Sequence, residues 1–280
     1  MASLALSAAK DQPVVRFLRP PHAAGLELVH YPNLTRGWRG IPEAYTWFTM
    51  IDRLEGDVDV ISRGMRAQCA PQSVTIGEPG EPYALRPRSP MRGEFRVIRV
   101  YQNLLAGIRD EMGVPFAGSL FPRAPQKDPA VNRSFSRLYR AIDDGETLAT
   151  QERLFTFLAA LADRGRRAPA PQANRDPRGV RRARELLHAR FQEMLPLAEL
   201  AQAAGTDRFA LLRAFSRELG MTPHEYQIHL RIARSCRLIA QGVPLADVAI
   251  AVGYSEQSAL HRPFTRLVGV TPGAYARALR

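Results

Sequence analysis

The sequence predicts an α+β protein, with an N-terminal antiparallel β-barrel that carries helices and a C-terminal all-α domain of two similar units joined by a long helix. Three observations support this prediction: short β-type runs fill the first hundred residues, a proline- and arginine-rich break lies near residue 170, and one helical pattern occurs twice in the last hundred residues. A chain of 280 residues is long enough for two cores. We expect domains at 1–165 and 177–280, with a linker at 166–176.

The repeated pattern covers residues 197–226 and 245–275. In each copy an apolar, helix-like stretch ends at a glycine, Gly205 or Gly253, and a second helix-like stretch follows. Both copies close with a Thr-Pro pair and a tyrosine three residues after the proline. The second copy is one residue longer between its landmarks. Internal similarity of this kind indicates one supersecondary unit used twice.

Each unit is predicted to be a helix, a tight turn and a second helix. Asp207 and Ser255 are the expected N-caps of the two second helices. The apolar side of these helices points inward, and polar and basic residues lie outward. The outward residues are Arg208, Phe209, Leu212, Arg213 and Ser216 in the first copy and Gln257, Ser258, His261 and Arg262 in the second. Such a unit is typical of the helix-turn-helix that enters a DNA major groove; an ordinary helical hairpin is the alternative, and duplication favours DNA.

The last hundred residues resemble the AraC/XylS family of bacterial transcription regulators. The resemblance rests on the run from 245 to 253, the spacing of Phe264 and Gly269, and the closing Gly-Val-Thr-Pro-Gly-Ala-Tyr at 269–275. It implies two helix-turn-helix units that read successive major-groove segments of double-stranded DNA, and RNA polymerase as a partner. The implied base-facing residues are Phe209, Leu212 and Arg213 in the first unit and Gln257, Ser258, His261 and Arg262 in the second. We expect Arg217 and Arg266 to contact phosphates.

Two residues depart from the family pattern. Leu212 stands where a polar side chain is expected, so it either contacts a thymine methyl group or makes the first unit less discriminating. Pro263 falls inside the second recognition segment, where it removes one helical hydrogen bond and is expected to kink or loosen the helix. The pattern Thr222-Pro-His-Glu225 is a capping box, which predicts the start of the long connecting helix.

The N-terminal hundred residues predict an antiparallel barrel or sandwich. Valine-, isoleucine- and aromatic-rich runs alternate with Gly-Pro turns; the expected strands lie at 26–31, 45–51, 57–61, 73–76 and 94–100. Helices are expected at 101–112, 131–144 and 150–164, and their apolar stripes suit either packing on the barrel or contact with a second copy in a homodimer. Ahead of an AraC-like tail, this region resembles the cupin-type sensing domain of such regulators.

A barrel interior is a natural pocket for a small-molecule effector. The candidate lining residues are Trp47, Phe48, Met50 and Met65, although such residues in strands more often form plain core. A metal-dependent cupin enzyme fused to a DNA-binding tail is the alternative function. Such an enzyme needs a cluster of histidines, and only His22 and His30 precede residue 180. We therefore expect a non-enzymatic protein without a metal or other cofactor.

The charge and composition of the chain indicate which classes of partner it binds and where it is located. The formal net charge of +12 favours a polyanionic partner, with nucleic acid ahead of an anionic membrane. No segment approaches the ~20 apolar residues needed to cross a bilayer, and residues 1–11 make a poor signal peptide. Two isolated cysteines, Cys69 and Cys236, predict neither a disulfide framework nor the metal-clustered thiols of a DNA-repair methyl acceptor. A further alternative is a protein-interaction domain whose duplicated unit no longer binds DNA. Arg213 and Arg262, at matched positions in the two copies, argue against this alternative. The expected location is the cytoplasm.

Overall fold

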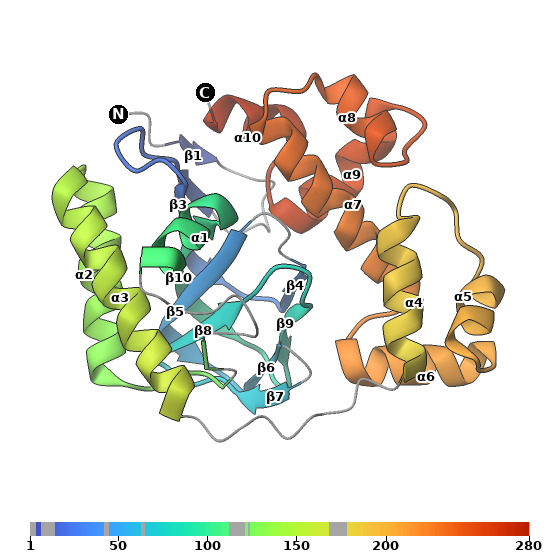
Figure 1. The fold of residues 1–280 in the computed structure, drawn as a ribbon, viewed down its shortest axis with the longest axis horizontal. Coiled ribbons are helices and arrows are strands. Elements are labelled where there is room, and N and C mark those ends of the chain that lie inside the picture. Colours follow the sequence, from blue (N-terminus) through green and yellow to red (C-terminus); the bar gives the residue numbers. More distant parts are fainter. Residues whose placement is uncertain are drawn as a thin grey trace.

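The computed structural model describes residues 4–6, 15–41, 45–62, 65–111, 121–122, 124–167 and 178–279. Ten strands precede ten helices in the described part of the chain, and Figure 1 shows a sheet-rich part beside a helical part. This arrangement confirms the predicted α+β class. The expected linker begins within a helix that ends at Arg167, and its remaining residues lie outside the described ranges. The domain boundaries therefore stay a prediction.

The strands form two antiparallel sheets. The six-stranded sheet has the order β1-β2-β3-β10-β5-β8, and the four-stranded sheet has the order β4-β9-β6-β7. The first sheet consists of β1 (Leu4–Leu6), β2 (Val15–Leu18), β3 (Leu26–Leu34), β10 (Arg92–Tyr101), β5 (Tyr45–Glu55) and β8 (Ser73–Gly77). The second consists of β4 (Trp38–Gly40), β9 (Tyr83–Pro87), β6 (Val58–Ser62) and β7 (Met65–Gln68).

The barrel is not closed, which corrects one detail of the sequence prediction. No ladder joins the two sheets among the described strands; at the edge, Ser62 Oγ donates a hydrogen bond to the Ile76 carbonyl. Strand β8 instead meets Gln126 through an isolated bridge at Val74. The two sheets pack face to face, with Trp47 and Val97 of the large sheet and Tyr83 and Leu85 of the small one in a single core.

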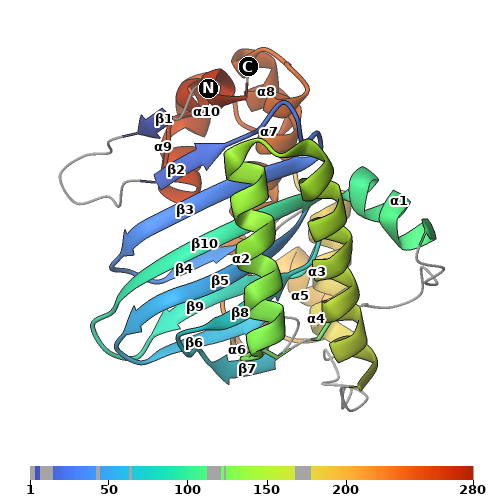
Figure 2. The ribbon, with the colours of Figure 1, turned by 90° about the vertical axis from the view of Figure 1, so that its left-hand side faces the viewer.

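Three helices follow the strands: α1 (Gln102–Glu111), α2 (Pro129–Asp144) and α3 (Thr147–Arg167). Helices α2 and α3 cross the outer face of the large sheet (Figure 2). The Phe48 ring on β5 meets Phe157 of α3 edge-on at 5.1 Å, and Phe157 meets Phe135 of α2 at 5.7 Å. Buried aromatic pairs at these distances pack the helices firmly against the sheet.

The C-terminal part is entirely helical. Its elements are α4 (Arg178–Ala189), α5 (Leu197–Ala204), α6 (Arg208–Leu219), α7 (Pro223–Ala240), α8 (Leu245–Ala251), α9 (Gln257–Val268) and α10 (Pro272–Ala278). The pairs α5–α6 and α8–α9 are the two predicted helix-turn-helix units, and α7 is the long connecting helix. The predicted capping box at its start is present: Glu225 accepts from the Thr222 backbone, and Thr222 Oγ1 accepts from the Glu225 backbone.

The two units have different surroundings. The first unit forms a core with α4, centred on Phe215 and Tyr226. The second unit shares one apolar cluster with the inner face of the N-terminal sheets, so Phe264 and Tyr275 belong to the same core as Phe17. The Phe17 and Tyr275 rings meet edge-on at 6.2 Å. The N-terminal domain therefore packs directly on the second unit.

Candidate DNA interface and inter-domain pocket

The first recognition helix, α6, begins as the sequence predicts. Gly205 adopts a left-handed φ of 69°, and the Asp207 carboxylate accepts hydrogen bonds from the backbone nitrogens of Phe209 and Ala210. These bonds lower the pKa of Asp207, with the Ala210 bond as the largest cause. The buried residues are Leu211, Phe215 and Leu219. Of the predicted contacts, Arg208, Phe209, Arg213 and Arg217 are exposed and Leu212 is half-buried.

Phe209 is 70% exposed, so its ring is free to contact a partner. Arg217 lies on the last turn of α6, where its Nε donates to Glu218 at 2.9 Å. The first unit thus presents guanidinium groups and one uncovered aromatic ring on a single recognition helix. Such a surface suits phosphate contacts, base-edge hydrogen bonds and apolar contact in a major groove.

The second recognition helix, α9, presents the corresponding set. Its exposed residues are Gln257, Ser258, His261, Arg262 and Arg266. Its N-cap is Glu256, without a side-chain cap bond, so the prediction of Ser255 was wrong by one residue. Ser258 instead donates to the Glu256 carboxylate. Pro263 lies inside the helix, which nevertheless runs without interruption to Val268. The expected kink or loosening at Pro263 stays a prediction.

Arg231 of α7 fastens the two units together. Its Nε donates to the Phe191 carbonyl at 2.7 Å, and its Nη1 donates to the Gly253 carbonyl at 3.0 Å. Its Nη2 donates to the carbonyls of Gln192 and Glu193, both at 3.0 Å. One guanidinium thereby joins the segment after α4 to the turn of the second unit. This clamp fixes where α9 stands relative to the first unit.

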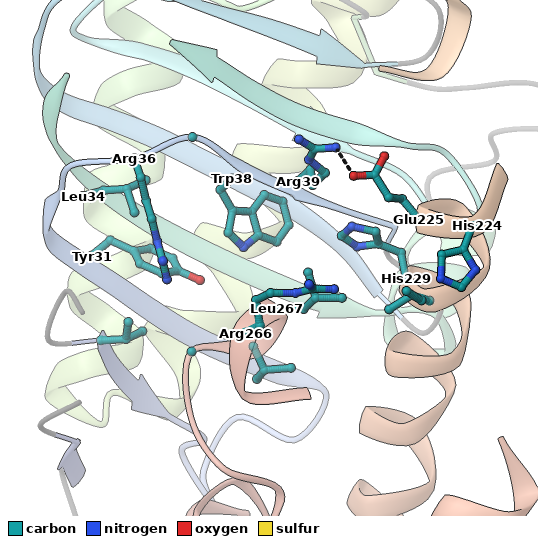
Figure 3. Close-up of a pocket in the computed structure, with 15 residues that line it drawn as sticks. Tyr31, Leu34, Arg36, Trp38, Arg39, His224, Glu225, His229, Arg266 and Leu267 are labelled. Atoms are coloured by element: carbon teal, nitrogen blue, oxygen red, sulfur yellow. Dashed lines mark hydrogen bonds and ion pairs between the residues drawn. The ribbon is translucent and has the colours of Figure 1, made fainter. Parts of the chain in front are cut away.

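A cavity of about 450 Å³ lies between the N-terminal strands and the C-terminal helices. Its walls come from β2, β3 and β4 on one side and from α7 and α9 on the other (Figure 3). The charged and titratable lining residues are Arg36, Arg39, His224, Glu225, His229 and Arg266. The apolar and aromatic lining includes Val15, Tyr31, Leu34, Trp38, Ile228 and Leu267. The volume and mixed lining are those of a small-molecule site.

Charges in this cavity are unevenly paired. Arg39 donates to Glu225 at 3.1 Å, which joins β4 to α7. The pKa of Glu225 is lowered because the Thr222 backbone bond and Arg39 outweigh burial, which acts in the opposite direction. Burial, aided by Arg39, lowers the pKa of His229 to about 4. His229 is therefore neutral at pH 7 and able to hydrogen-bond without adding charge.

The four residues predicted to line an effector pocket do not meet. Trp47 faces the sandwich interior, where it lines a cavity of only about 30 Å³ and its ring lies 4.8 Å from that of Trp38. Phe48 and Met50 are buried on the opposite face of β5, within the core formed with α2 and α3. Met65 is half-buried on β7. Their role in effector binding stays a prediction, while the larger cavity lies outside this set.

Sequence reasoning missed the inter-domain residues. Arg39 lies on the short strand β4 and Arg36 lies two residues before that strand, while Glu225 and His229 are one helical turn apart on α7. The four-residue spacing on a helix could have been noticed, but nothing local in the sequence brings β4 to this helix. No group of three or more potential metal-ligating side chains occurs among the described residues, and His30 is hydrogen-bonded to Glu94 at 3.0 Å.

Two family models match the chain. One describes a helix-turn-helix domain and covers residues 200–278, and the other describes an AraC-like ligand-binding domain and covers residues 34–158. The chain belongs to the AraC family. Within the described residues of this AraC-family protein, no helix is both long and apolar enough to span a membrane.

Individual relatives support the same assignment. An AraC-like transcription regulator of Streptomyces antibioticus is 37% identical over 99 residues, which are 35% of this chain and 33% of that protein. The transcriptional regulator RipA of Corynebacterium diphtheriae is 33% identical over 121 residues, 42% of this chain and 34% of its own length. The matched segment thus spans about a third of these relatives. The crystal structure of ToxT from Vibrio cholerae is 13% identical with a TM-score of 0.52, covering 92% of this chain and 99% of that chain, which shows a shared fold.

Proposed function

We propose that this AraC-family protein is a sequence-specific regulator of transcription that binds double-stranded DNA through α6 and α9 and is controlled by a small-molecule effector. The observation that carries the proposal is the pair of helix-turn-helix units whose exposed faces place Arg213 and Arg262 at matched positions. The protein acts in the bacterial cytoplasm, where its DNA lies. RNA polymerase is the implied downstream partner, and a second copy is a further one.

The effector site belongs at the inter-domain cavity rather than deep in the sandwich. The interior cavity of about 30 Å³ has room for little more than a water molecule. The cavity of about 450 Å³ touches both the N-terminal sheets and α9, so its occupant contacts the sensing domain and a recognition helix at once. A ligand can shift an equilibrium only through unequal contacts with two states, and this location provides them.

The DNA-binding proposal is tested by comparing two pairs of arginines. After an operator has been selected from genomic DNA, Arg213→Ala and Arg262→Ala should each cost about 1–3 kcal/mol of binding and relax the preference at one base position. Arg217→Ala and Arg266→Ala should weaken all sequences alike and reduce the salt slope by about one. Fluorescence anisotropy with matched and randomised duplexes measures both effects. Identical behaviour of the two pairs would contradict the assigned faces.

A metal-dependent enzyme is the competing function. The matched relatives bear names of transcription regulators, which supports a non-enzymatic role. Elemental analysis of the purified full chain separates the two: stoichiometric tightly bound metal would favour the enzyme, and its absence together with specific DNA binding would favour the regulator.

A further inference from the structure

Asp207 and Glu256 occupy matched positions in the repeat, but their carboxylates have different partners. Each is the N-cap residue directly before a recognition helix, α6 or α9. The Asp207 carboxylate accepts hydrogen bonds from the backbone nitrogens of Phe209 and Ala210, both at 2.9 Å, so it is turned back onto its own helix. Glu256 makes no side-chain cap bond and accepts instead from the Ser258 hydroxyl. The second unit therefore has a carboxylate at this position that the helix backbone does not engage.

The fold of the chain does not explain this carboxylate. Glu256 is exposed, and it has no ion-pair partner among the residues that the structure describes. It stands at the start of α9, the helix whose exposed Arg262 and Arg266 are expected to meet DNA. Because DNA phosphates are negative, an acidic group at this place weakens binding by repulsion unless a hydrogen-bond donor of the DNA reaches it.

The hydrogen bond between Ser258 and Glu256 determines which donor fits. Ser258 uses its single hydroxyl hydrogen on the carboxylate, so the two side chains together present only acceptors. In the major groove guanine and thymine present acceptors, which a carboxylate repels, and adenine presents its amino group beside the acceptor N7. Cytosine presents its N4 amino group alone. Since the N-terminal residues of a recognition helix are those that contact base edges, cytosine is the base that suits this pair.

We propose that Glu256 is a specificity-determining residue that accepts a hydrogen bond from the N4 amino group of a cytosine in the half-site read by α9, with Ser258 holding the carboxylate in place. The inference rests on the proposed function, since Glu256 reads a base only if α9 enters the groove. Asp207 has no such role, because its carboxylate is bound to the backbone of α6. Matched positions of the two units therefore contribute unequally to the sequence that is recognised.

The first experiment compares base preferences of the full chain and its variants, after circular dichroism has shown that each variant is folded. Every base pair of an operator selected from genomic DNA is replaced in turn by the other three, and fluorescence anisotropy gives the affinity for each duplex. The α9 half-site is the one in which Arg262→Ala changes a preference. At one position of this half-site the wild type should favour cytosine about tenfold, and Glu256→Ala should reduce the preference to less than about twofold.

Two further variants separate base reading from a structural role. Glu256→Gln keeps the size of the side chain and adds an amide donor, which together with the amide oxygen matches N7 and the amino group of adenine. Its preference at the assigned position should therefore move from cytosine to adenine. Asp207→Asn is the matched control: asparagine caps helices as well as aspartate does, so the preference at every position should stay that of the wild type.

The second experiment removes the proposed donor from the DNA. N4-methylcytosine still pairs with guanine, and its methyl group replaces the amino hydrogen that faces the major groove. With this base at the assigned position, wild-type affinity should fall about tenfold, while the affinity of Glu256→Ala should change by less than about twofold. The same base at a cytosine of the α6 half-site should affect the two proteins alike.

The outcomes distinguish this proposal from the proposed function. Specific DNA binding in which Glu256→Ala loses no cytosine preference, or an equal response of wild type and Glu256→Ala to the methylated base at the assigned position, overturns the role of Glu256 alone. Failure of the wild type to bind any DNA in a salt-dependent manner overturns the proposed function itself.

Discussion

The turn glycines of the two units offer a matched test of how the second unit is held in place. Gly205 and Gly253 occupy the same position in the repeat and have φ values of 69° and 84°. A Cβ at position 205 would lie 3.9 Å from Arg182 Nη1, a normal contact with a mobile side chain. A Cβ at position 253 would lie 2.2 Å from the Gln192 carbonyl oxygen. An alanine at either position has the same left-handed backbone strain, but only the alanine at position 253 would also clash with the Gln192 backbone.

The expected magnitudes follow from these contacts. Left-handed backbone costs an alanine roughly 1–2 kcal/mol, partly offset by a less flexible unfolded chain, so Gly205→Ala should lose about 1 kcal/mol. Gly253→Ala must in addition displace the Gln192 backbone, which costs about 1–3 kcal/mol for overpacking. The displacement also disturbs the Arg231 bonds to Gln192 and Gly253, worth about 1.5–3 kcal/mol each. Gly253→Ala should therefore lose about 3–5 kcal/mol.

Native-state hydrogen exchange is the suitable assay, because a two-domain chain need not unfold in one step. Amides in 245–268 should lose protection in Gly253→Ala while those in 208–219 keep most of theirs. The Gly205→Ala variant should show a small loss confined to its own unit. Operator selection with Gly253→Ala should relax the half-site read by α9. Equal loss of protection in the two variants would show that the Gln192 contact does not hold the second unit.

Three further predictions concern other parts of the chain. Burial lowers the pKa of His229 in the folded chain from 6.5 to about 4. Between these pH values the unfolded chain binds a proton at His229 that the folded chain does not bind. About 3 kcal/mol of folding stability, present above pH 6.5, is therefore lost as the pH falls toward 4. Urea unfolding of His229→Gln should lack this part of the loss, while the exposed control His224→Gln should retain it. Pro263→Ala should raise thermal stability by up to about 3 kcal/mol and alter base preference only in the α9 half-site; unchanged stability and preference would make the proline neutral. A fragment of residues 177–280 should be folded by circular dichroism and bind DNA in a salt-dependent manner, and a folded fragment without such binding would contradict the DNA assignment.

The helical half was predictable because its signals are local. Asp207 caps the helix that it precedes, and Thr222 forms the predicted capping box. The error at Ser255 has a local cause as well: α9 starts one residue later, at a Glu256 that accepts from Ser258 rather than from the backbone. Apolar periodicity also placed the buried residues of α6, because one face of a helix is read from spacing alone.

The N-terminal half was predictable only in part. The expected strands correspond to β3, β5, β6, β8 and β10, whereas β1, β2, β4, β7 and β9 were missed, and they have only three to five residues each. Alternation along β5 shows which residues share a face but not what covers it. Trp47 meets the small sheet, and Phe48 meets α3, which lies about a hundred residues away in sequence. The effector pocket could not be derived because its walls depend on such distant contacts.

The two units also show why sequence equivalence does not settle structural equivalence. Each has a buried tyrosine after its Thr-Pro pair, and each tyrosine packs edge-on against its own unit's phenylalanine at 5.5–5.6 Å. Tyr226 is covered by α4, where its hydroxyl lies 2.8 Å from His188 Nε2. Tyr275 is covered by β2 of the N-terminal domain, through Phe17.

The N-terminal domain thus does for the second unit what α4 does for the first. Removing residues 1–176 takes only Ile41 from the first core but uncovers one side of Tyr275, which is only 2% exposed in the full chain. Burial of an aromatic side chain is worth roughly 1.5–3 kcal/mol, so the isolated fragment should fold with its second unit weaker than its first. Any movement of the N-terminal domain then acts on α9 more than on α6. An effector in the inter-domain cavity is therefore expected to act on the half-site read by α9 more than on the one read by α6.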